Sequence, residues 1–139
     1  MLHRHPDRCR FPHGHSRTIE VVVAADALDV NGMVLDFKAL KLAIGPFIQR
    51  YDHAMAIHRD DPLRPAIEAV YPESLIVYED CDPTTEAMAA QLFDQVAQVL
   101  ADGVTVLDGE IAYTIPAGQA RLERLRIWET PSSWAEVGA

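Results

Sequence analysis

The fold class is set by residues 121–130, RLERLRIWET, near the end of the chain. Apolar and polar residues alternate along this stretch, which predicts a β-strand with one face against a hydrophobic core. The alternation places Leu125, Ile127 and Glu129 on the same face. The carboxylate of Glu129 is therefore expected on the apolar side of a sheet, where a charge is costly unless a partner binds it.

Two kinds of partner are compatible with Glu129. One is an arginine of the same chain, which would make the pair structural. The other is a ligand that carries two parallel N–H donors, because a carboxylate accepts such a pair in bidentate fashion.

Further strands are predicted on both sides of the chain's centre. The run RTIEVVVAA at residues 17–25 predicts a strand, since β-branched residues suit a pleated sheet. Asn31-Gly32 is a turn signal and residues 33–35 predict a short returning strand, so we expect a hairpin there. Asp108-Gly109, between two apolar runs, predicts a second hairpin.

Two apolar stripes with helical spacing predict two helices. Asp36 is a candidate N-cap for a helix from residue 37 to about 51, and Gly45-Pro46 should kink or break it. Asp82-Pro83 predicts the start of a second helix, because a capping residue followed by proline is typical of a first turn. We also expect a short strand at residues 75–78 in the long connection between them. The second stripe consists of Met88, Leu92, Phe93, Val96 and Leu100.

This order of elements predicts an α+β fold, with two helices packed on one face of an antiparallel sheet. The 139 residues suffice for one hydrophobic core, so we expect a single domain over residues 1–139. A net charge of −9 argues against nucleic acid as a partner, and no apolar stretch is long enough for a membrane. Two cysteines form no disulfide framework, and the cytoplasm is the expected compartment.

Basic residues crowd the start of this acidic chain. Arg4, Arg8, Arg10 and Arg17 fall within the first seventeen positions, with Asp7 as the single acid among them. Two interpretations stay open. The arginines form a solvated tail, or they form a locally positive mouth for an anionic substrate.

The segment Cys9-Arg-Phe-Pro-His13-Gly-His15 is the strongest candidate for chemistry. In an extended segment His13 and His15 share one face, so that both imidazoles can bind one zinc ion. The alternative is a pair of solvent-exposed turn histidines. The flanking Arg8 and Arg10 favour the thiolate of Cys9, whose alternative role is that of an inert buried residue.

Asp52-His53, at the end of the first helix, is a second candidate pair. A carboxylate can orient a neighbouring imidazole for proton transfer, but adjacent residues rarely touch, which favours an ordinary polar helix end. Thr84 and Thr85 are expected as polar residues of the second helix's first turn.

Together these segments resemble the family of 6-pyruvoyl-tetrahydropterin synthases and queuosine-pathway 6-carboxy-tetrahydropterin synthases. The resemblance covers about residues 5–136 and rests on the order of five motifs rather than on any one of them. The motifs are residues 9–15, 32–37, 52–53, 82–86 and 128–130.

The resemblance implies a tunnelling fold that assembles into an oligomeric barrel, a homo-hexamer built as a dimer of trimers with active sites between subunits. It implies a Zn²⁺ cofactor and a small-molecule pterin triphosphate, 7,8-dihydroneopterin triphosphate, as substrate. The compact motif around Cys9 favours 6-carboxy-5,6,7,8-tetrahydropterin as the product over the 6-pyruvoyl compound. In the resemblance Cys9, Asp52 and His53 are catalytic, His13 and His15 bind the metal, and Glu129, Thr84 and Thr85 hold the pterin.

One family feature is absent. Members of the family usually begin with a strand ending in Ala-Ala-His, whose histidine is the third zinc ligand, and Met1 falls almost at that position. We therefore expect one of two cases. Either the first family strand is missing or truncated, or His3, or less favourably His5, substitutes as the third ligand.

Two functions of other kinds remain as alternatives. A chain without a complete metal site would be a catalytically silent oligomer that binds pterins or purines through Glu129. A zinc hydrolase, in which Glu86 or Asp52 activates water, is the weaker alternative.

Overall fold

The computed structural model describes residues 1–139 as three α-helices and seven strands, with two short 3-10 turns. The helices are α1 (Phe37–Gln49), α2 (Arg64–Val70) and α3 (Thr85–Asp102). The strands are β1 (Thr18–Ala24), β2 (Met55–His58), β3 (Leu75–Tyr78), β4 (Val104–Asp108), β5 (Ile111–Ile115), β6 (Arg121–Thr130) and β7 (Ser133–Gly138). None of the helices combines the length and the apolar character that crossing a bilayer requires.

The main sheet has the strand order β1-β6-β7 and is antiparallel throughout. The alternating stretch that predicted its central strand matches β6 in full, and Leu125 and Ile127 are buried as expected. Ile127 lies between Ile19 of β1 and Ala135 of β7. The register between β6 and β7 shifts between Trp128 and Thr130, so that Glu129 lies at an irregularity between two paired positions.

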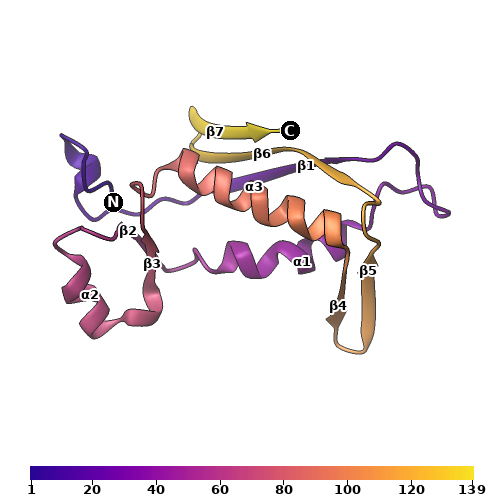
Figure 1. The fold of residues 1–139 in the computed structure, drawn as a ribbon, viewed down its shortest axis with the longest axis horizontal. Helices are drawn as coiled ribbons and strands as arrows, with labels where there is room; N and C mark the ends of the chain where they lie inside the picture. The colour runs from indigo at the N-terminus through magenta and orange to yellow at the C-terminus, as the bar shows by residue number, and fades with distance from the viewer.

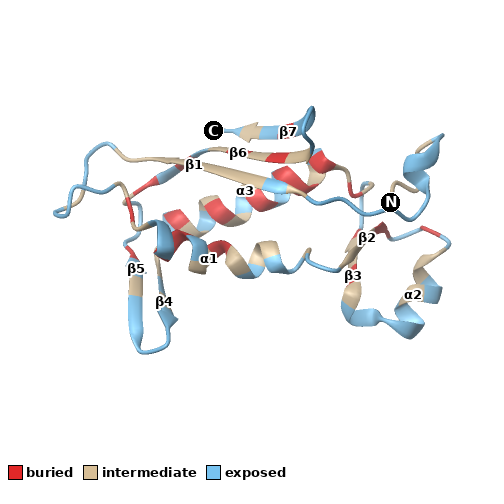
Figure 2. Ribbon diagram, turned by 180° about the vertical axis from the view of Figure 1, so that it is seen from behind, coloured by how far each residue is buried: buried red, intermediate tan, exposed pale blue.

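The core lies on one side of this sheet. In Figure 1 α3 runs directly beneath the strands and α1 forms the next layer, and Figure 2 shows the buried residues between them. Four predicted stripe residues of α3 are buried, and Phe93 packs against the core at its edge. The buried members are Met88, Leu92, Val96 and Leu100.

One of the two predicted helix starts is confirmed and the other is wrong. Asp36 caps α1, since its Oδ1 accepts from the backbone N–H groups of Lys38 and Ala39. The prediction that Asp82 caps the second helix is wrong, because α3 begins two residues later with Thr84 as its N-cap. The carboxylate of Asp82 instead accepts from the backbone N–H groups of His3 and Arg4 at 2.9 Å each, which fastens the N-terminal segment beside α3.

The break expected at Pro46 is also absent, because α1 continues through it to Gln49. Pro46 lies in the last turn and costs the helix one internal hydrogen bond, and the apolar face of α1 packs against the core on both sides of it.

Of the two predicted hairpins, one is found and one is not. β4 and β5 pair around Gly109, whose φ of 61° suits the left-handed turn that glycine allows. Residues 33–35 form no strand, and β1 pairs with β6 instead. Asp29 explains the difference, because its carboxylate accepts from the backbone N–H groups of Asn31 and Met33 and closes a local turn.

Residues 55–78 form a small unit, of which the sequence predicted only the strand at residues 75–78. The strand expected at residues 75–78 is β3, and it pairs in parallel with β2. A parallel pair needs a crossover connection, and α2 lies in that connection. The α+β class and the antiparallel main sheet are thus confirmed, with a third helix and a parallel pair added.

Candidate functional site

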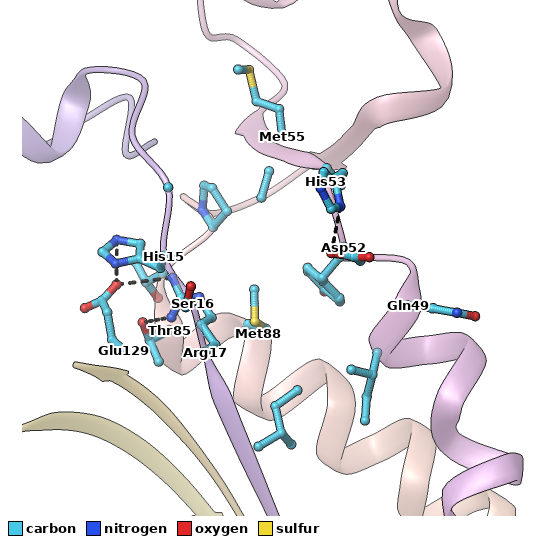
Figure 3. Close-up of a pocket in the computed structure, with 18 of the residues that line it drawn as sticks. His15, Ser16, Arg17, Gln49, Asp52, His53, Met55, Thr85, Met88 and Glu129 are labelled. Carbon is cyan, nitrogen blue, oxygen red and sulfur yellow. Dashed lines mark hydrogen bonds and ion pairs between the residues drawn. The ribbon is translucent and has the colours of Figure 1, made fainter. Parts of the chain in front are cut away.

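One cavity of about 1360 Å³ opens between the N-terminal segment, the end of α1, the start of α3 and the end of β6. Its walls come from parts of the chain that are far apart in sequence, and Figure 3 shows how their side chains converge. Eight of the nine residues predicted for the site line this cavity, and His3 is the exception. The eight are Cys9, His13, His15, Asp52, His53, Thr84, Thr85 and Glu129.

The partner of Glu129 in the chain is Arg17. Nη2 of Arg17 donates to Oε1 of Glu129 at 3.1 Å, and Nε2 of His15 lies 3.3 Å from the same oxygen (Figure 3). The internal arginine considered from the sequence is therefore present. Both contacts fall on Oε1, so that Oε2 is used by neither and Glu129 retains acceptor capacity for a ligand.

The two threonines have different surroundings. Oγ1 of Thr84 accepts from the backbone N–H of Ala87, so this hydroxyl caps α3. Oγ1 of Thr85 accepts from Nη1 of Arg17 at 2.6 Å. Thr85 is therefore the threonine that the structure joins to Glu129, through the guanidinium that both oxygens share.

His13 and His15 lie close together at the cavity wall, with ring centroids 4.9 Å apart and the rings nearly perpendicular. Nδ1 of His13 donates to the carbonyl oxygen of Phe11, so that Nε2 is the nitrogen of this ring that could face a metal. Burial lowers the pKa of His15 below its ordinary value, against the opposing effect of Glu129. The lowered pKa favours the neutral form of His15, which is the form that binds a metal.

His3 does not join them. Its ring stacks on buried His58 at 5.7 Å, its Nδ1 lies 3.9 Å from Asp61, and its backbone N–H is held by Asp82. In this structure His3 therefore lies apart from His13 and His15, held by contacts with β2 and Asp82, and its role as third zinc ligand stays a prediction.

Within the single chain the donor set for zinc is incomplete. Nowhere in residues 1–139 are three or more His, Cys, Asp or Glu side chains arranged to hold a metal ion. A catalytic zinc needs three protein ligands, and the cavity supplies two clear ones, His13 and His15.

Asp52 and His53 form the hydrogen-bonded pair that their adjacency argued against. Nδ1 of His53 lies 2.9 Å from Oδ1 of Asp52. His53 adopts a φ of 53°, in the left-handed region that non-glycine residues rarely occupy, at the turn after α1. The pair is open to solvent, with 92% of the His53 side chain and 70% of the Asp52 side chain exposed.

Cys9 is exposed as well, in the short 3-10 turn Arg8–Arg10. The alternative of an inert buried cysteine is therefore excluded. The thiol is accessible to a substrate in the cavity that Cys9 lines.

Arg17 is the site residue that the sequence analysis did not single out. It was counted among the four early arginines, without a role of its own. A signal was present, because Arg17 follows His13 and His15 at the same two-residue spacing, and all three line the cavity.

Comparison with known proteins agrees with this fold. The model of the 6-pyruvoyl tetrahydropterin synthase family matches residues 1–139, and the chain belongs to that family. The predicted resemblance is thereby confirmed, and so is the prediction of an enzyme, since this is a family of lyases.

Several relatives carry the name 6-carboxy-5,6,7,8-tetrahydropterin synthase. The chain is 30% identical to the one from Aquifex aeolicus over 133 residues, which covers 94% of this chain and 75% of the relative. It is 29% identical to the one from Rickettsia felis over 135 residues, which covers 96% and 87%. The fold also matches the crystal structure of an uncharacterized protein from Wolinella succinogenes, with a TM-score of 0.66, 23% identity and coverage of 94% and 80%.

Proposed function

We propose that this chain is a lyase that converts 7,8-dihydroneopterin triphosphate to 6-carboxy-5,6,7,8-tetrahydropterin. The names of the relatives support the product, and one observation in the structure supports the substrate. The Glu129 carboxylate and the Thr85 hydroxyl lie at one wall of the cavity, bridged by Arg17.

This arrangement suits the 2-amino-4-oxo edge of a pterin. The edge offers two parallel N–H donors, which a carboxylate accepts together. Oγ1 of Thr85 already accepts from Arg17, so its own hydrogen is available for the 4-oxo group. A carboxylate acceptor next to a hydroxyl donor therefore matches the pterin edge atom by atom.

Proton transfer is assigned to the other walls of the same cavity. Cys9 would remove a proton from a side-chain carbon of the substrate. His53, oriented by the hydrogen bond that its Nδ1 donates to Asp52, would exchange protons with the substrate's hydroxyl groups.

Zinc is the cofactor that the resemblance implies, and His13 and His15 would be two of its ligands. The single chain supplies no third ligand.

We also propose that the active cavity forms in a homo-hexamer. Both outer strands of the main sheet, β1 and β7, have an unpaired edge in the single chain, and such edges favour pairing with further strands. The cavity also exceeds the 300–1,000 Å³ typical of small-molecule pockets, so a neighbouring subunit has room to contribute a wall.

The test is to incubate the purified protein with 7,8-dihydroneopterin triphosphate and to identify the products by chromatography and mass spectrometry. We expect 6-carboxy-5,6,7,8-tetrahydropterin together with acetaldehyde and inorganic triphosphate, with one water consumed. A 6-pyruvoyl product would keep the substrate and correct the reaction, and unchanged substrate would refute the lyase.

The incomplete donor set favours a second candidate, a catalytically silent pterin-binding oligomer. Metal analysis of the purified protein separates the two candidates. About one zinc per chain is the expectation for the enzyme. Absence of metal together with tight pterin binding would establish the silent binder.

A further inference from the structure

Arg17 lies where three elements meet at the cavity wall. It directly precedes β1, and its guanidinium reaches the first residue of α3 and the end of β6 (Figure 3). Nη1 donates to Thr85 Oγ1 at 2.6 Å and Nη2 donates to Glu129 Oε1 at 3.1 Å. Only 18% of the Arg17 side chain is exposed, so water competes little for these donors.

An arginine–glutamate pair by itself is an ordinary surface feature that contributes little. Here, however, one rigid plane reaches two different acceptors, and both belong to residues that line the cavity. Because the guanidinium is planar and its donors keep a fixed geometry, it sets the two oxygens relative to each other.

The same contacts determine which hydrogen-bonding groups face a ligand. Arginine has no acceptor, so Thr85 must accept from it and can use its own hydrogen only as a donor to another group. Glu129 contributes Oε1 to Arg17 and keeps Oε2 outside that contact. The cavity wall therefore presents an acceptor and a donor in a fixed order.

We propose that Arg17 is a positioning residue that sets the ligand selectivity of this wall, through Glu129 and Thr85 and without a contact to the reacting atoms. The inference rests on the proposed pterin function. It assigns to Arg17 the preference for a ligand with a 2-amino-4-oxo edge over one with a 2,4-diamino edge. In the diamino ligand an amino group replaces the 4-oxo acceptor. Its hydrogens then face the hydrogen of the Thr85 hydroxyl, and no hydrogen bond forms.

The first arm of the test is binding selectivity. We would measure dissociation constants for neopterin and for its 2,4-diamino analogue with the wild-type protein, Arg17→Met and Arg17→Lys. The wild type should prefer neopterin by about 10-fold or more, which is the effect of one mismatched hydrogen bond to a buried group. In Arg17→Met the affinity for neopterin should fall by about 10-fold, with most of the preference lost, because Thr85 is free to rotate.

Arg126→Met is the matched control. Arg126 is about as buried as Arg17 and pairs with Glu136 at 2.6 Å, but it does not line the cavity. This variant should keep both dissociation constants within about twofold of the wild type, as for a surface ion pair. Lysine at position 17 keeps the charge but reaches only one of the two oxygens at a time, so Arg17→Lys should recover affinity in part without restoring the preference.

The second arm does not depend on pterin binding. Crystal structures of ligand-free wild type and Arg17→Met should show the Glu129 carboxylate and the Thr85 hydroxyl displaced in the variant, with the β6 backbone unchanged. If Arg17→Met does not fold, Arg17→Lys takes its place in both arms.

The outcomes separate the two proposals. If the wild type binds no pterin, the proposed function fails, and the crystal structures alone decide the role of Arg17. If the Glu129 carboxylate and the Thr85 hydroxyl keep their positions in Arg17→Met, the positioning role of Arg17 is overturned. Where the wild type binds neopterin, an unchanged preference in Arg17→Met would overturn it too, even if both ligands bind more weakly.

Discussion

The two halves of the cavity differ in how firmly their side chains are held. Glu129, Thr85 and Arg17 are tied to one another across the ends of β6, α3 and β1. Cys9, Asp52 and His53 sit in exposed turns, and the Asp52–His53 pair makes its hydrogen bond in full contact with solvent. The chain thus has an ordered half suited to binding and an exposed half suited to reaction, which a neighbouring subunit can enclose.

The largest effect should come from the exposed half. Cys9→Ala should reduce kcat by about 10³-fold, since it removes the proposed proton-abstracting group, and should leave neopterin binding within about twofold. Cys81→Ala is the control, because Cys81 is the other exposed free cysteine and lies outside the cavity. Full activity of Cys9→Ala would favour the water-activating hydrolase and break the division between the halves.

His53→Gln should come next, with a loss of about 10² in kcat and little change in KM, because proton transfer contributes to the reaction and not to ring binding. Its melting temperature should stay close to that of the wild type, since the side chain is almost entirely exposed. His5→Gln, outside the cavity, serves as the control. If the substitution changed only KM, His53 would act in substrate binding and not in proton transfer.

Glu129→Gln tests the ordered half of the cavity and should change ligand binding more than kcat. Removal of the charge should weaken neopterin binding by about 10- to 100-fold, the effect of one or two hydrogen bonds to a charged group. Glu136→Gln is the control, because Glu136 also pairs with an arginine but on the other face of β6. If binding were unaffected, the pterin edge would have to be held elsewhere.

The smallest expected effect concerns the pH dependence of stability that comes from the Tyr51–Tyr78 pair, beside the exposed half of the cavity. Tyr51, next to Asp52, shares a hydrogen bond of 2.8 Å with buried Tyr78, and burial raises the pKa of both phenols. The folded chain therefore holds protons that the unfolded chain releases near pH 10, so the free energy of unfolding should fall as pH rises above about 10. Tyr78→Phe should flatten this dependence in urea unfolding measured from pH 8 to 11, and an equally steep fall would refute it.

Local patterns in the sequence predicted what local physics determines. The alternation of β6, the stripe of α3 and the cap at Asp36 each depend on residues within one element, and each is found. The alternation along β6 also predicted Glu129 on the apolar face of the sheet, and Glu129 lines the cavity. Asp52 and His53 were a candidate pair from their place at the helix end, and the resemblance added a catalytic role for them. Their contact occurs at a left-handed residue, which no spacing rule predicts.

The failures are cases in which a distant segment competed with a local one. Asp82 looked like a cap, but two backbone N–H groups from residues 3 and 4 claim its carboxylate. Residues 33–35 looked like a returning strand, but β6 offers β1 a longer apolar partner. In both cases a contact between distant segments replaced the local one, and the sequence carries no local signal for such a contact. A contact of the same kind places His3, whose ring stacks on His58 apart from His13 and His15.

The tie between Arg17 and Glu129 also has a consequence for the order of folding. The two residues are 112 positions apart, and the bond from His3 to Asp82 spans 79 positions. Contacts between such distant segments form late, because the long loops between them must close first. During synthesis the helices can form while the chain is still growing, but the cavity has to wait for β6, near the end of the chain. We therefore expect the ability to bind a pterin to appear in the last kinetic phase of refolding, after the helical signal is complete.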